Sequence, residues 1–149
     1  MKSKERIILQ RLNRAFLTNP LIESNYEYNR FDAENTKYIV EIKSRNNKYD
    51  QTIIEFDKFS YNLLYAKENN KFFVYAVKMD DKIYIFNITK LKEYNYNFNW
   101  EWREMPKYTE FNNTKNIRKL VGYINIEDAT KVYWQKVVGC NAQQLHFCR

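Results

Sequence analysis

Three polar residues that lie close together in the sequence are of the types that bind metal ions and assist hydrolysis. Asp32 is followed by eight residues and then by Glu41-Ile42-Lys43. In an extended strand, side chains two residues apart point to the same face, so Glu41 and Lys43 would be neighbours. The turn-prone run Glu34-Asn35-Thr36 separates them from Asp32, and a hairpin there would bring Asp32 beside this pair.

Two carboxylates and a lysine in this arrangement suit metal-assisted hydrolysis of a phosphodiester. Mg²⁺ prefers oxygen ligands and keeps several waters, so Asp32, Glu41 and the backbone carbonyl of Ile42 are candidate ligands. The metal would hold a phosphate oxygen and stabilise the charge of the transition state, while Lys43 would orient the attacking water. The same residues could instead form ordinary salt bridges on a solvent-facing sheet.

The composition excludes several other kinds of chemistry. With only two glycines, the 149 residues contain neither a P-loop nor a dinucleotide-binding fingerprint, because both need several glycines in one turn. The single histidine, His146, argues against sites built from several imidazoles. With Cys140 and Cys148 it provides only three of the four ligands of a structural zinc site. Chemistry must therefore come from carboxylates, lysines or tyrosines.

The charge balance predicts a polyanionic partner. The net charge is +7 and the isoelectric point is about 9.3, which favours nucleic acid first and an anionic membrane surface second. No run of about 18 apolar residues is present, so we expect no membrane-spanning helix. We expect a cytoplasmic protein in which Cys140 and Cys148 are reduced thiols.

The hydrophobic pattern predicts one α/β domain over residues 1–149, with a mixed central sheet flanked by helices. Helices are expected over residues 3–17 and 52–67, and strands over residues 25–33, 37–45, 71–78 and 82–89. Glu5 falls on the apolar face of the first helix. Glu55, Lys58 and Asn62 form a polar stripe on the second helix.

The segment that follows residue 90 is rich in aromatic and basic side chains. Aromatic and polar residues alternate over 94–102, which predicts a strand with one aromatic face. That face could be half of the core or a platform that stacks on bases. The basic residues within 103–119 could contact phosphates or form a solvated face. We expect a further strand over residues 119–124 and a short helix or an irregular tail over residues 126–134.

The motif and its placement resemble the PD-(D/E)xK nuclease superfamily, whose members have a restriction-endonuclease-like core. Asp32 matches the first acid and Glu41-Ile42-Lys43 the (D/E)xK triplet, whereas Phe31 stands where the signature has proline. The expected order helix–strand–strand–helix–strand–strand agrees with the family core over roughly residues 3–90. Residues 91–149 would then be a basic and aromatic extension. The chain is also similar in outline to small phage nucleases, which would place it in the host cytoplasm.

The resemblance implies a Mg²⁺- or Mn²⁺-dependent endodeoxyribonuclease that cleaves DNA. Asp32 and Glu41 would bind the metal, and Lys43 would assist the attacking water. Many members carry another acid on the first helix, which here would be Glu5, although a helix-start acid is also favoured by the helix dipole. Some add a polar residue on the helix after the motif, and Lys58 or Glu55 matches it.

Two further questions remain open at the level of sequence. Many members of the superfamily work as dimers, and the sequence does not decide between a monomer and a homodimer. A catalytically silent nucleic-acid-binding or assembly protein on the same fold is the alternative to the nuclease.

Overall fold

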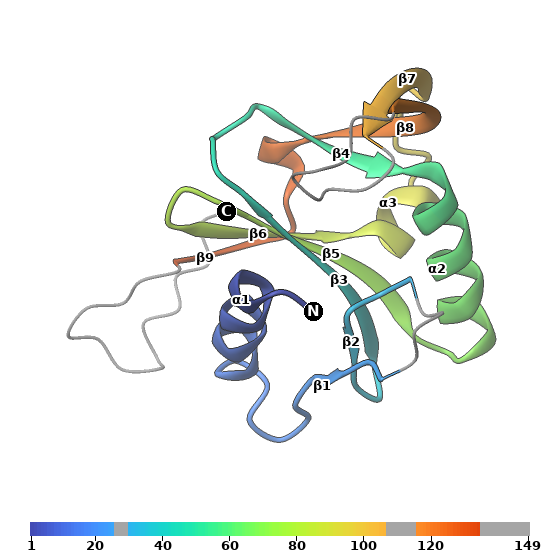
Figure 1. The fold of residues 1–149 in the computed structure, drawn as a ribbon. Coiled ribbons are helices and arrows are strands. Elements are labelled where there is room, and N and C mark those ends of the chain that lie inside the picture. The colour runs from blue at the N-terminus through green and yellow to red at the C-terminus, as the bar shows by residue number, and fades with distance from the viewer. Residues whose placement is uncertain (26–29, 107–115, 135–149) are drawn as a thin grey trace.

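The computed structural model describes residues 1–25, 30–106 and 116–134 and contains two β-sheets and three α-helices in these ranges (Figure 1). The main sheet has the order β1-β2-β3-β5-β6-β9, and the second sheet has the order β4-β8-β7. The strands of the main sheet are β1 (Ile22–Glu23), β2 (Ala33–Glu34), β3 (Tyr38–Arg45), β5 (Phe72–Met79), β6 (Lys82–Asn87) and β9 (Lys131–Trp134). The second sheet contains β4 (Gln51–Glu55), β7 (Glu101–Pro106) and β8 (Asn116–Asn125). The helices are α1 (Ser3–Asn13), α2 (Phe56–Glu68) and α3 (Ile88–Glu93), with a 3₁₀ turn at Ile126–Asp128.

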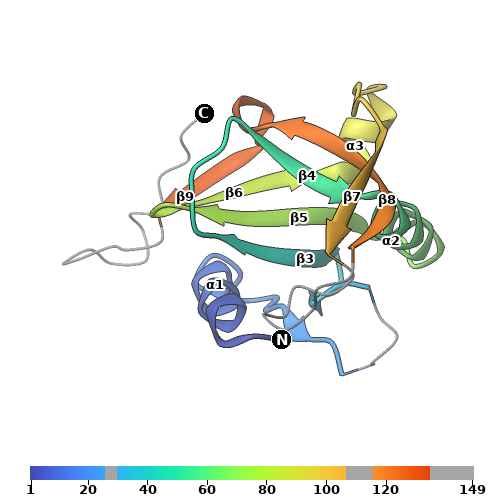
Figure 2. The ribbon, with the colours of Figure 1, turned by 45° about the horizontal axis from the view of Figure 1, so that its top comes forward.

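The main sheet is mixed and flanked by helices, as the sequence predicts. β3 and β5 are parallel, and every other pair of neighbours is antiparallel. The parallel pair is connected through β4 and α2, which cross over one face of the sheet. Helix α1 covers the opposite face, so the second sheet and α1 lie on opposite sides of the main sheet (Figures 1 and 2).

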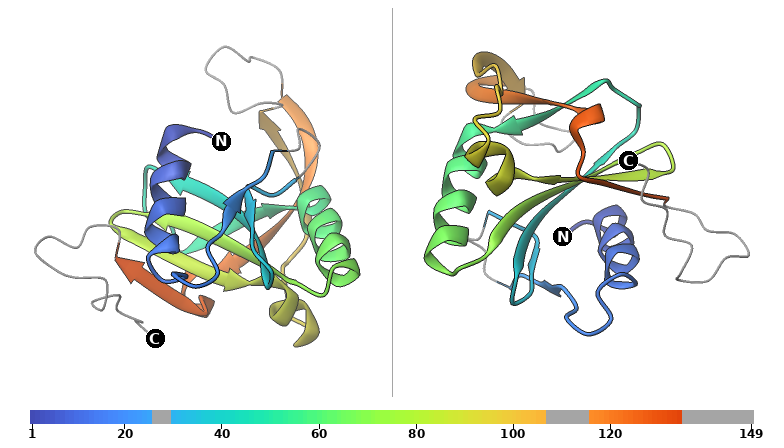
Figure 3. Two further views of the ribbon diagram at one scale, coloured as in Figure 1. Left: turned by 90° about the horizontal axis from the view of Figure 1, so that it is seen from below. Right: turned by 180° about the vertical axis from the view of Figure 1, so that it is seen from behind.

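Alternating residues of β3 enter two separate hydrophobic cores. Val40 and Ile42 pack with Ile8 of α1, whereas Ile39 packs with Phe59 of α2. Because the sheet is covered on both faces, the first part of this strand, Tyr38 to Ile42, is apolar at four of its five positions. Glu41, on the same face as Ile39, is therefore a charged residue within a buried layer. Seen from below, α1 (blue) lies in front of the main sheet (Figure 3, left).

Two predicted helices have different ends in the structure. Helix α1 stops at Asn13, not at residue 17, because the Asn13 amide bonds both backbone groups of Leu21, at 2.8 and 2.9 Å. The helix predicted over residues 52–67 begins only at Phe56. Residues 51–55 form β4, which pairs antiparallel with β8 and places Ile53 opposite Tyr123. This strand pairing outweighs the local helical pattern.

The strand predicted over residues 94–102 is wrong. Asn95 and Asn99 adopt φ angles of 56° and 50°, which interrupt an extended backbone, and β7 begins only at Glu101. The core interpretation holds for three of the aromatic residues, Tyr96, Phe98 and Trp100, which pack against the core around Phe59. Tyr94 and Trp102 are instead 79% and 61% exposed.

The remaining chain predictions have mixed outcomes. The strands over residues 37–45, 71–78 and 119–124 are confirmed, although the last is part of the longer β8. The strand over residues 82–89 ends at Asn87, where its side chain caps α3 by accepting the Lys90 N–H. Residues 126–134 form a 3₁₀ turn and β9, not a helix or an irregular tail. Of the expected strand over 25–33, residues 26–29 lie outside the described part and residues 30–32 form a bend, so only Ala33 lies in a strand, β2. Lys107, Lys115, Cys140, His146 and Cys148 also lie outside the described residues.

Gly122 of β8 has no side chain, so Phe98 and Trp100 can pack directly against its backbone. A Cβ at this position would lie 2.9 Å from Trp100 Cζ3 and 3.0 Å from Phe98 Cβ. We expect Gly122→Ala to lower the free energy of unfolding by about 1–3 kcal/mol, measured by urea denaturation. Arg118→Ala, at an exposed position of the same strand, should change it by less than about 0.5 kcal/mol. Equal effects of the two substitutions would contradict this packing.

Candidate metal and phosphodiester site

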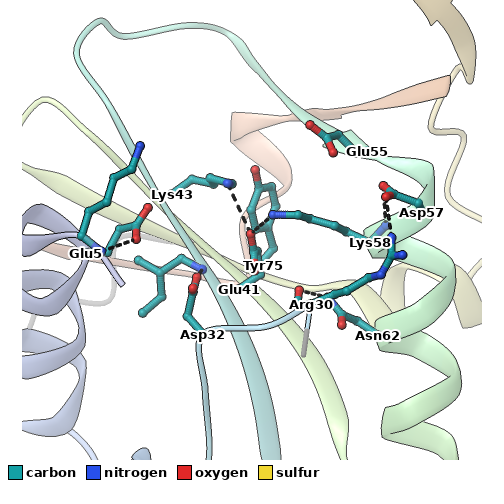
Figure 4. A network of polar contacts seen from close by, with 12 residues as sticks. Glu5, Arg30, Asp32, Glu41, Lys43, Glu55, Asp57, Lys58, Asn62 and Tyr75 are labelled. Atoms are coloured by element: carbon teal, nitrogen blue, oxygen red, sulfur yellow. Dashed lines mark hydrogen bonds and ion pairs between the residues drawn. The ribbon is translucent and has the colours of Figure 1, made fainter. Parts of the chain in front are cut away.

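Asp32 lies where the pairing of β2 with β3 ends. Its backbone N–H donates to the Val40 carbonyl at 2.9 Å, and its Oδ2 accepts the Ile42 N–H at 2.7 Å. Residues two apart on a strand present their backbone groups to the same edge, so the Asp32 side chain continues the ladder beyond β2. By the same rule, the Ile42 carbonyl faces this edge beside Asp32. Figure 4 shows Asp32 at the edge of the sheet.

Helix α2 fixes the segment that precedes Asp32. Asn62, which is fully buried, donates from Nδ2 to the Arg30 carbonyl at 2.9 Å. The Arg30 guanidinium forms an ion pair with Asp57 at 2.5 Å. Phe31, in place of the proline of the motif, is buried with its ring centroid 4.9 Å from that of Tyr65. The position of Asp32 therefore depends on the packing of α2 against the main sheet.

The Glu41 carboxylate is buried and paired with two lysines. Only 4% of Glu41 is exposed, and its Oε1 lies 2.6 Å from Lys58 Nζ and 3.4 Å from Lys43 Nζ. A buried carboxylate is costly without cationic partners, and these two ammonium groups offset its charge. Burial alone would lower the pKa of Lys58, but the charge and the hydrogen bond of Glu41 outweigh it and raise this pKa above its ordinary value. Lys58 is thus a stable cation at neutral pH.

Asp32 is the electrostatically unfavourable member of the site. Burial, and next the charge of Glu41, raise the pKa of Asp32 to about 7, although the Ile42 hydrogen bond acts in the other direction. Glu5 adds a smaller repulsion from α1. Of the residues described, none forms an ion pair with Asp32. A bound cation would therefore relieve the repulsion between these carboxylates.

Glu5 approaches the site from the opposite layer. In Figure 4 its carboxylate points toward Asp32 and Lys43, and its Oε2 accepts the backbone N–H of Lys2 at 3.1 Å. This bond is part of the capping box at the start of α1. Glu5 thus has the helix-start role that the sequence allows, and it also stands near Asp32.

A pocket of about 30 Å³ lies over Glu41 and has room for about one water molecule. Of the described residues, its lining includes Lys43, Lys58 and Tyr75 but not Asp32. The Tyr75 hydroxyl donates to the Ile53 carbonyl at 3.0 Å, and burial raises the pKa of Tyr75 to about 12. This hydroxyl is therefore protonated at neutral pH and can act as a fixed dipole.

Sequence reasoning missed Tyr75, because only the parallel pairing of β3 with β5 places it opposite Glu41. Glu55, which the sequence offers as an alternative to Lys58, lines the same pocket but pairs with Lys119 of β8 at 3.2 Å. Lys58 is the residue of the polar stripe that contacts Glu41.

The donor set suits a hard divalent cation. Asp32 and Glu41 offer carboxylate oxygens and Ile42 a carbonyl oxygen, which is the chemistry that Mg²⁺ and Mn²⁺ prefer. Within residues 1–25, 30–106 and 116–134, no three His, Cys, Asp or Glu side chains form a group that could hold a metal on their own. A cation would therefore rely on the two motif carboxylates, the carbonyl and water.

Comparison with known proteins does not identify a family for this chain. No protein-family model matches the sequence, and no curated protein matches it. Among the described helices, none is long and apolar enough to span a membrane.

The raised pKa of Asp32 predicts how stability depends on pH in metal-free buffer. Because the folded-state pKa is about 7 and the ordinary value is 3.8, the protonated carboxyl stabilises the fold below about pH 4. This contribution is lost as the pH rises through about 7. Asp32→Asn cannot ionise and keeps an acceptor for the Ile42 N–H, so it should be more stable than the parent at pH 8, by up to about 4 kcal/mol. Urea denaturation at several pH values measures this difference.

The matched control for this prediction is Glu34→Gln. Glu34 is a carboxylate of β2, two residues after Asp32, but it pairs with Lys71 at 2.8 Å. Its substitution should leave the fall in stability between pH 4 and pH 8 in place. The same fall in Asp32→Asn as in the parent protein would contradict the account of the Asp32 pKa.

Proposed function

We propose that this chain is a Mg²⁺- or Mn²⁺-dependent nuclease of the PD-(D/E)xK type that hydrolyses DNA phosphodiester bonds. One observation carries the proposal: β2 and β3 place Asp32 beside Glu41, and Lys43 and Lys58 surround Glu41. The order α1, β2, β3, α2, β5, β6 supports a restriction-endonuclease-like core, to which β1 and β4 are added.

Each residue of the site has a role that follows from its contacts. Asp32, Glu41 and the Ile42 carbonyl would hold the divalent ion, and the Ile42 N–H keeps the Asp32 carboxylate in one orientation. The bound ion would polarise the scissile phosphate and make a water molecule more acidic. Glu41 positions the ammonium groups of Lys43 and Lys58 at the pocket.

The two lysines are suited to different tasks. The raised pKa of Lys58 makes it a poor proton acceptor, so it would neutralise a phosphate oxygen as a fixed cation. Lys43 lies 3.4 Å from Glu41, a longer separation than the 2.6 Å of Lys58, and its ammonium is the freer of the two to orient the attacking water. Tyr75 lines the same pocket, and its hydroxyl donates to the Ile53 carbonyl.

A catalytically silent DNA-binding protein on the same fold is the second candidate. It is favoured by the neutralisation of Glu41 by two lysines and by the position of Asp32 outside the pocket over Glu41. Such a protein would bind DNA without metal, with a strong dependence on salt, and would not cleave it.

Removal of the Glu41 carboxylate tests the nuclease directly. We expect Glu41→Gln to lower the rate of Mn²⁺-dependent cleavage of labelled DNA by at least about 100-fold, because a metal ligand and the anchor of both lysines are lost. Lys43→Met should lower the rate by a similar factor.

The control variant is again Glu34→Gln, which removes a carboxylate–lysine pair on the neighbouring strand β2 and should retain full activity. Circular dichroism and thermal melting establish that each variant is folded. Cleavage by folded Glu41→Gln at the rate of the parent protein would refute the proposed site.

A further inference from the structure

A solvent-open groove extends from the pocket over Glu41 along the second sheet. It has a volume of about 770 Å³ and shares Arg45, Ile53 and Met105 with that pocket. A second hollow of about 500 Å³ continues the groove, and Tyr49 lines both. The three hollows thus form a continuous series that begins at the candidate site.

The alternation of side chains along β3 places the positive charge of Arg45 where the groove meets the pocket over Glu41. Glu41, Lys43 and Arg45 alternate along the strand and therefore share one face. Arg45 lies about 13 Å from Glu41 at the strand rise of about 3.3 Å per residue. In the part of the chain that the structure describes, Arg45 forms no ion pair. Its guanidinium is available for an anionic ligand.

The opposite wall of the groove presents a second guanidinium. Arg103 of β7 is exposed, and its Nη1 donates to the Tyr123 hydroxyl at 3.2 Å. The Tyr123 hydroxyl in turn donates to Glu101, so the side chains of this wall are held in place. Asp50 also lines the groove, and it is the acidic residue among its described lining. Two arginines against one aspartate leave the lining positive.

An exposed aromatic ring lies between the two larger hollows. Tyr49 is 51% exposed and lines both hollows, so one face of its ring is accessible from the groove. Aromatic rings beside a positive groove stack on the faces of unpaired bases, whereas bases within a duplex do not offer those faces. The groove has the volume of a pocket for a small ligand or a nucleotide, not that of a double helix.

We propose that this groove binds a segment of single-stranded DNA and directs its phosphodiester toward Glu41. Arg45 and Arg103 contact phosphates from the two walls, and Tyr49 stacks on a base. The delivery of the strand for cleavage rests on the proposed nuclease activity, whose substrate would then be single-stranded DNA. Binding of the strand itself requires no metal.

The chain contains a matched control on the other face of the same strands. Trp102 is 61% exposed, and the Arg118 guanidinium lies 5.9 Å from the centre of its ring. Because neighbouring side chains of β7 point to opposite faces, Trp102 faces away from the groove that Arg103 lines. This pair has the same chemistry as the groove but lies outside it.

Fluorescence anisotropy of the full chain in EDTA tests the proposal, with a labelled oligothymidylate and a labelled duplex of the same length. We expect tighter binding of the single strand. Tyr49→Ala should weaken it by about 5- to 150-fold. Arg45→Ala and Arg103→Ala should each reduce the slope of log affinity against log salt by about 0.7. Trp102→Ala and Arg118→Ala should leave affinity and slope unchanged.

Tighter binding of the duplex would refute the proposal that the groove binds single-stranded DNA. Loss of single-strand binding only in the Trp102 and Arg118 variants would refute it as well. Cleavage of the same DNA in Mn²⁺ separates this result from failure of the nuclease. If the parent protein binds the single strand through the groove but does not cleave it, the proposed nuclease activity is refuted and the proposed binding site is retained. If the protein cleaves duplex DNA in preference and Tyr49→Ala cleaves at the same rate, the proposed binding site is refuted and the proposed nuclease activity is retained.

Discussion

The ion pair between buried Glu41 and Lys58 is the interaction on which the arrangement of the site depends. A carboxylate on the inner face of a sheet needs a cation, and the nearest is supplied by α2 at 2.6 Å. Helix α2 can deliver Lys58 there only if it packs across the parallel strands β3 and β5. The same packing lets Asn62 hold the backbone before Asp32. One helix therefore aligns both carboxylates of the motif.

The parts of the site that follow from local periodicity could be predicted from the sequence. The alternation of Glu41 and Lys43 and the turn before them suffice to bring Asp32 to β3, and the polar stripe identifies Lys58. Residues placed by distant strand pairing could not be predicted. β4 is a strand because it pairs with β8, more than 60 residues later. Tyr75 reaches the pocket only through the parallel register of β5 with β3.

The second sheet connects the candidate site to the rest of the surface. The second sheet forms one wall of the groove, and the end of β3 at Arg45 forms the other. Glu41, Lys43 and Arg45 lie on one face of β3, which runs from the pocket to the groove. Part of the net charge of +7 lies in the arginines that line a groove leading to the pocket over Glu41. Burial and the charge of Glu41 raise the pKa of Asp32 nearby. A polyanion and a divalent cation together would satisfy both features.

Binding of Mn²⁺ to the purified chain, measured by isothermal titration calorimetry near pH 8, tests the central claim most directly. We expect saturable binding that is lost in Asp32→Asn and retained in Glu34→Gln, because Asp32 and Glu41 together would hold the ion. Absence of saturable binding in the parent protein, or undiminished binding in folded Asp32→Asn, would contradict it.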